Sequence, residues 1–203
     1  MGMELEQLLY EQQDLWHGGQ SKDDSAAVLA TGFDALDELV GGWPRGDLSE
    51  IHCDAEGLAC LNLVIPLLAR LSVESRWIAW IAPPAIPDAL ALQAWGVDLS
   101  RVLLVHPPDS AGKLWALEQA LASGTCSAVL AWPETLSLLQ GQQLRRAAQQ
   151  GDAVGLLFQS QQRVAHSSAA ALRLQVHPRA DGMRLELLNL PDGGGLASLH
   201  ITL

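Results

Sequence analysis

Apolar and polar positions follow two rhythms along most of the chain. Strand candidates occur at Leu48–Cys53, Trp77–Ala82, Val102–His106, Ala128–Trp132 and Val154–Phe158. Of these, Trp77–Ala82 is a continuous apolar run, typical of a strand covered on both faces of a sheet. Between the strand candidates lie segments with a helical pattern, namely Leu58–Leu71, Asp88–Trp95, Ala111–Ala122 and Glu134–Gln150. Strands that alternate with helices predict βαβ units, and hence an α/β fold with a mainly parallel sheet.

The rhythm changes after Ser160. Three further strand candidates follow with no room for helices between them: Ala171–Val176, Met183–Leu188 and Ala197–Thr202. The segments that join them are rich in Gly, Pro and Asp, which favour tight turns. We therefore expect antiparallel strands at the C-terminal end of the sheet.

The first residues follow neither rhythm. Met3–Trp16 has Leu5, Leu8 and Leu9 near helical spacing, and a polar stretch with glycines comes after it. This predicts three parts: an N-terminal amphipathic helix (1–17), a flexible linker (18–27) and the α/β domain (28–203). The helix is either an appendage that binds a partner or a cover for one end of the core.

Composition and charge narrow the class of protein. The chain has 203 residues, of which 49% are apolar, enough for one packed domain. Its formal net charge of −11 repels phosphate backbones, so strong autonomous DNA binding is not expected. Three cysteines without framework spacing predict reduced thiols. No apolar run reaches membrane-spanning length and no signal peptide is visible, which predicts a cytoplasmic protein without membrane contact.

Several segments resemble RecA-type ATPases in the same order along the chain. Thr31–Asp37 and the Gly-rich turn Gly41–Gly46 are similar to the approach to the strand that precedes the phosphate-binding loop. Trp95–Asp109, Val154–Phe158 and Ala170–Leu174 resemble later parts of the same family. The resemblance implies a RecA-like three-layer fold with a mainly parallel central sheet, C-terminal antiparallel strands and an N-terminal helical appendage.

The residues of nucleotide chemistry are missing from the matching positions. A phosphate-binding loop needs a Lys and a hydroxyl after its glycines, but the stretch Asp54–Leu61 keeps only Gly57. Trp132 and Pro133 stand where a Mg²⁺-binding Asp is needed, and Ala82–Pro84 fills the place of the catalytic base. We therefore expect no enzymatic activity and no cofactor, with Trp132 plugging the vacated cleft.

RecA-like chains without this loop point to two bacterial families under DNA-damage control, ImuA and SulA. Four features here are similar to ImuA: the Leu-rich N-terminal helix, the turn at Gly41–Pro44, the corner at Ala82–Pro84, and His166–Leu172. The resemblance implies a non-catalytic adaptor of SOS-induced translesion DNA synthesis that bridges ImuB, an error-prone DNA polymerase and RecA. Segment 75–83 is common to both families, and the SulA alternative implies a cell division inhibitor that binds FtsZ.

Six residues are candidates for partner binding: Leu5, Leu8, Leu9, Trp16, Trp43 and Arg163. The first four are helix-in-groove anchors, for which self-association into a homo-oligomer is the competing explanation. Trp43 is a partner anchor or a cap of the sheet. Arg163 contacts a RecA filament or DNA, or lies in an ordinary loop.

The remaining tryptophans of the predicted strands and helices are expected in the core. Trp77 and Trp80 lie three positions apart on one strand and point to opposite faces, each under a helix. Trp95 and Trp115 have apolar neighbours on their helices.

Overall fold

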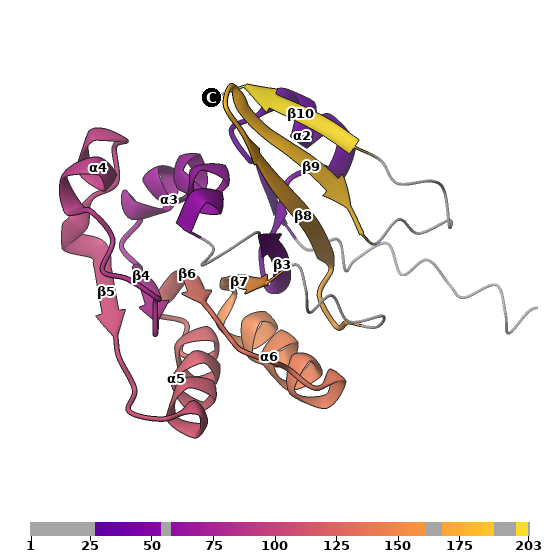
Figure 1. The fold of residues 1–203 in the computed structure, drawn as a ribbon. Coiled ribbons are helices and arrows are strands. Elements are labelled where there is room, and N and C mark those ends of the chain that lie inside the picture. Colours follow the sequence, from indigo (N-terminus) through magenta and orange to yellow (C-terminus); the bar gives the residue numbers. More distant parts are fainter. Residues whose placement is uncertain (1–26, 54–57, 161–167, 189–197, 203) are drawn as a thin grey trace, which may run out of the picture.

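An eight-stranded sheet runs through the molecule in the computed structural model, which describes residues 27–53, 58–160, 168–188 and 198–202 (Figure 1). Its order is β10-β9-β8-β3-β7-β6-β4-β5. The strands are β3 (Asp47–Cys53), β4 (Trp77–Ile81), β5 (Val102–Val105), β6 (Cys126–Ala131), β7 (Val154–Ser160), β8 (Leu172–Arg179), β9 (Gly182–Leu187) and β10 (Ser198–Thr202). Pairing is parallel from β8 to β5, and antiparallel from β8 to β9 and from β9 to β10. The predicted α/β fold with a mainly parallel sheet and C-terminal antiparallel strands is confirmed.

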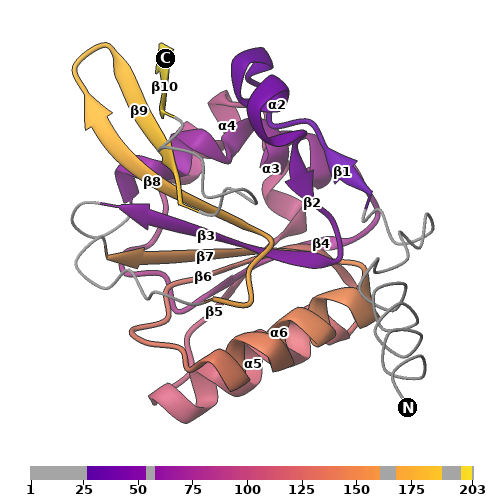
Figure 2. The same cartoon turned by 90° about the vertical axis from the view of Figure 1, so that its right-hand side faces the viewer.

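Helices cover both faces of the sheet (Figure 2). They are α2 (Asp34–Val40), α3 (Ile65–Ser72), α4 (Ala89–Ala94), α5 (Ser110–Ala122) and α6 (Leu138–Gly151), with 3₁₀ segments η1 (Leu58–Leu63) and η2 (Leu99–Arg101). A small second sheet pairs β1 (Val28–Leu29) with β2 (Trp43–Pro44). Helices α5 and α6 lie together on one face, whereas α3 and α4 lie on the other.

The alternation of side chains along each strand divides the core in two. On β4, Ile78 and Trp80 join the cluster shared with α3, while Ala79 and Ile81 join the cluster shared with α5 and α6. This is the period of two that an extended backbone imposes. Gly151 lets α6 approach α5, because a Cβ there would lie 1.9 Å from the Leu121 carbonyl oxygen.

Two predicted helices begin later than the apolar pattern suggested. The segment predicted as one helix over Leu58–Leu71 divides into η1 and α3, with Pro66 in the first turn of α3, where its missing N–H costs nothing. Helix α6 begins at Leu138 instead of Glu134. Its start is set by a capping box in which Ser137 and Gln140 bond each other's backbone N–H groups.

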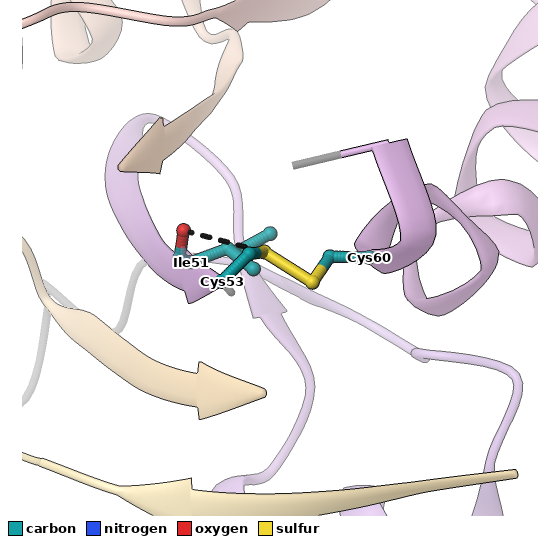
Figure 3. Close-up of a disulfide and its surroundings, with 3 residues drawn as sticks. All are labelled: Ile51, Cys53 and Cys60. Carbon is teal, nitrogen blue, oxygen red and sulfur yellow. Dashed lines mark hydrogen bonds between the residues drawn. A yellow bond between two sulfur atoms is a disulfide. The ribbon is translucent and has the colours of Figure 1, made fainter. Parts of the chain in front are cut away.

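The prediction of three reduced thiols is wrong. Cys53 at the end of β3 and Cys60 in η1 form a disulfide, with their Cα atoms 6.4 Å apart, and Cys126 is a free buried thiol (Figure 3). The two cysteines lie on consecutive elements, β3 and η1, and the odd cysteine count did not mark them as a pair. The bridge spans the stretch that matched a phosphate-binding loop.

Candidate protein-binding surface

The end of β6 carries an aromatic stack in place of metal-binding chemistry. Trp132 lies 4.9 Å from Phe158 and 5.7 Å from Trp80 between ring centroids, with the Phe158 ring almost parallel to it. This packing fits the hypothesis that Trp132 fills a vacated cleft. Among the described residues, no group of three or more His, Cys, Asp or Glu side chains is placed to hold a metal ion.

The centre of the sheet holds a buried carboxylate. Glu50 on β3 lies beside Arg173 on β8, whose Nε donates a 2.8 Å hydrogen bond to it. Ser168 also donates to Glu50 Oε1, and His52 Nε2 lies 3.3 Å from Oε2, the oxygen that accepts from Arg173. Burial alone raises the pKa of Glu50, but the hydrogen bonds from His52, Ser168 and Arg173 outweigh it and lower the pKa to about 2. Glu50 is therefore a fixed anion that joins strands, and it is a poor general base.

Strand β5, the outermost strand at one end of the sheet, presents apolar side chains to solvent. Among the described strands, β5 has a neighbour on one side only, β4. Its Leu103 and Leu104 pair with Ala79 and Trp80, which belong to different core clusters, so the two leucines lie on opposite faces of the strand. Both are exposed. Unpaired backbone and apolar side chains thus coincide along one strand.

The helices beside β5 extend this exposed apolar area. In the α4 layer, Ile86 and Leu90 are each 77% exposed. On α5, Trp115 is 65% exposed. This helix packs on β6 and β4, the two strands nearest to β5, while α6 packs on β3 and β7.

A cation lies at the amino end of this area. The Arg101 guanidinium carbon lies 6.0 Å from the centroid of the half-exposed Trp77 ring, and Arg101 Nη1 donates to the Ser75 carbonyl oxygen at 3.3 Å. We call the whole area the β5 edge surface, and it comprises Trp77, Ile86, Leu90, Arg101, Leu103, Leu104 and Trp115. Exposed apolar side chains that gather around the edge of a sheet mark a candidate protein-binding site.

The predicted partner-binding residues do not lie on the β5 edge surface. Trp43 is 0% exposed, so it is a core residue that caps the sheet through the β1–β2 pair and cannot anchor a partner. The other five lie outside the described residues: Leu5, Leu8, Leu9, Trp16 and Arg163.

The expectation that Trp77, Trp95 and Trp115 pack in the core is wrong, since all three are exposed. Only Trp80 of the four is buried. Apolar neighbours in sequence do not show which side chains of an element face solvent: Trp77 is the first residue of β4, Trp95 follows α4, and Trp115 lies on α5.

Comparison with known proteins gives a consistent set of names. The family model described as cell division inhibitor SulA matches residues 46–155. A cell division inhibitor SulA from Edwardsiella piscicida is 36% identical over 132 residues, which are 65% of this chain and 77% of that protein. The one from Pseudomonas aeruginosa is 40% identical over 135 residues, 63% of this chain and 84% of that protein. A crystal structure of SulA from Pseudomonas aeruginosa covers 56% of this chain and 97% of that chain, at 37% identity and a TM-score of 0.48.

Proposed function

The chain belongs to the SulA family of cell division inhibitors, and from that premise we propose that it blocks bacterial division by binding FtsZ in the cytoplasm. Family membership and relatives that share the inhibitor name support the proposal. The structural observation that carries it is the β5 edge surface, where apolar side chains are exposed along an outer strand. A protein that acts by binding needs such a surface and needs no catalytic group.

The assignment to ImuA is wrong, because the family model and the relatives are those of SulA. The predicted role as a translesion adaptor for ImuB, a polymerase and RecA rested on that assignment and is wrong as well. Three of the four features that favoured ImuA lie outside residues 46–155, the part that the SulA model matches. Segment 75–83, common to both families, lies inside it. The similarity to ImuA therefore rests mainly on segments outside the part that defines the SulA family.

We further propose that the domain descends from RecA-like ATPases and has no nucleotide hydrolysis. The positions that matched the phosphate-binding loop and the metal-binding Asp follow β3 and β6, two parallel strands separated by β7. A disulfide spans the first position and the stack of Trp132 on Phe158 fills the second. Titration with Mg²⁺-ATP should leave the tryptophan fluorescence unchanged, and micromolar binding would contradict a closed site.

Binding of FtsZ can be assigned to the β5 edge surface with charge substitutions. Leu90→Glu and Leu103→Glu each place a carboxylate in the apolar area, and we expect FtsZ affinity to fall at least about tenfold, as for a buried unpaired charge at an interface. Leu139→Glu is the matched control, since Leu139 is 65% exposed but lies on α6. The readouts are co-sedimentation with purified FtsZ and filament formation by cells that express each variant.

Two results would count against this assignment. Equal loss of FtsZ binding in the Leu139→Glu control would show that added negative charge, and not its position, is responsible. Unchanged binding in both Leu90→Glu and Leu103→Glu would show that FtsZ binds a part of the molecule other than the β5 edge surface.

A further inference from the structure

A cavity lies at the carboxyl ends of β4 and β6, on the face covered by α5 and α6. These strands are neighbours, but the chain leaves them towards opposite faces of the sheet. After β4 it forms α4, whose Leu92 packs in the α3 cluster, and after β6 it forms α6 in the other cluster. Such a divergence opens a crevice, and it is where open α/β sheets bind ligands. Ala82, Trp132 and Pro133, which stand at positions of the lost nucleotide chemistry, line this cavity, whereas no described residue of β3 or η1 does.

The cavity has the size and floor of a small-molecule site. Its volume is about 300 Å³, at the lower end of the range for ligand pockets. Ile81, Ala131, Leu114 and Leu117 supply apolar walls from two strands and one helix. Ala82, which continues the wall from β4, has a φ of 49°, and strained non-glycine backbone of this kind gathers at ligand sites.

Polar groups converge on this apolar floor from two directions. The first turn of α5 contributes Ser110 and Lys113, and the connection from β6 to α6 contributes Glu134 and Thr135. Within the part of the chain that the structure describes, the Lys113 ammonium has no hydrogen-bond or ion-pair partner. The ammonium group favours an anion through its charge, while the amino end of α5 is already capped by Asp109, whose carboxylate accepts from the Gly112 N–H at 2.7 Å.

We infer that this cavity binds a small monocarboxylate with an apolar body. The carboxylate would meet Lys113 and Ser110 at the start of α5, and the body would cover Ile81, Leu114 and Leu117. The described lining residues include one cation, Lys113, and one acidic residue, Glu134, in a chain of net charge −11, so a di- or triphosphate would not be neutralised. The inference does not depend on FtsZ binding, and each can fail without the other.

Octanoate is a suitable probe, with octylammonium as its charge-reversed match. In ¹H–¹⁵N correlation spectra of the full chain, octanoate below its micelle concentration should shift the amides of Ser110, Lys113 and Thr135 saturably. We expect a Kd of about 1 mM or tighter for a ligand of this size. Octylammonium should leave these amides in place.

Variants at Lys113 test the charge directly. Lys113→Met should weaken octanoate binding about tenfold, and Lys113→Glu should abolish it while admitting octylammonium. Arg146→Met is the control, because Arg146 is an exposed cation on α6 that does not line the cavity. Thermal midpoints of all variants would establish that they are folded.

Three outcomes would overturn the inference. They are unshifted cavity amides at about 10 mM octanoate, tenfold above the expected Kd, equal weakening by Lys113→Met and Arg146→Met, and equal binding of octylammonium by the unsubstituted chain. FtsZ co-sedimentation of Lys113→Met, measured in parallel, reports on the proposed function alone.

Discussion

The central strand β3 and the outer strand β5 reverse the usual distribution of side chains. On β3, Glu50 and His52 are buried, and Arg173 of β8 is buried against them. On β5, Leu103 and Leu104 are exposed. Burying a charge costs free energy unless the charge is paired. Exposed apolar groups are common on protein surfaces and gain free energy when a partner covers them. The polar groups at the centre therefore hold strands together, while the apolar groups at the edge are available for binding.

This contrast also separates two kinds of substitution. Changes around β3 should alter the free energy of unfolding, and changes on the β5 edge surface should alter partner affinity. Each experiment below compares a residue of one region with a matched residue elsewhere.

The largest effect is expected from Arg173→Met, which leaves Glu50 buried without its cation. The free energy of unfolding should fall by about 3 to 5 kcal/mol, the usual cost of breaking a buried ion pair. Urea unfolding measures it. Arg184→Met, which removes the half-exposed partner of Glu186, should cost less than about 1 kcal/mol. Similar losses in both variants would show that Glu50 is not held as described.

The second largest effect is expected from acid, which should lower the free energy of unfolding through Glu50 on the central strand β3. The pKa of Glu50 is lowered from 4.5 in the unfolded chain to about 2 in the folded protein. Its contribution to stability is therefore complete above about pH 4.5 and is lost as the pH falls towards 2, at a scale of a few kcal/mol. In urea unfolding between pH 5 and 2, Glu50→Gln should show a shallower loss than the unsubstituted chain. Parallel curves would refute the assignment to Glu50.

Reduction of the Cys53–Cys60 disulfide should have a smaller effect. The two cysteines are seven residues apart, and closing so short a loop stabilises the folded state by about 2 kcal/mol. A reducing agent should lower the free energy of unfolding by that amount. The double variant Cys53→Ala/Cys60→Ala should be insensitive to it, while Cys126→Ala keeps the full response. A response in the double variant would mean that another group is being reduced.

The smallest change in stability is expected from a substitution on the β5 edge surface. Leu90→Glu should alter the free energy of unfolding by less than about 0.5 kcal/mol, because Leu90 is largely exposed, even though we expect the same variant to lose FtsZ binding. Differential scanning calorimetry measures the first quantity and co-sedimentation the second. A large loss of stability would show that the side chain packs in the core, and the contrast between the two regions would then fail.

Much of the fold could be predicted from local pattern, and little of the site could. Apolar runs located β4, β6 and β7, since burial on both faces removes polar residues from a strand. Strand order is a property of the whole sheet, and it left Leu103 and Leu104 of β5 exposed although the run Val102–Val105 is apolar. Lys113 carried no signal at all in the sequence, because its importance comes from the cavity that the ends of β4 and β6 form beside it.

The sequence by itself determined the alternation of strands and helices, the change to antiparallel strands after Ser160, and the loss of Lys and hydroxyl groups after β3. All three are local, because they depend on which residues follow one another. Only the tertiary structure placed Glu50 beside Arg173, 123 residues away, joined Cys53 to Cys60, and left β5 outermost. These depend on which strands become neighbours, and the free energy that selects the neighbours comes from packing the whole core.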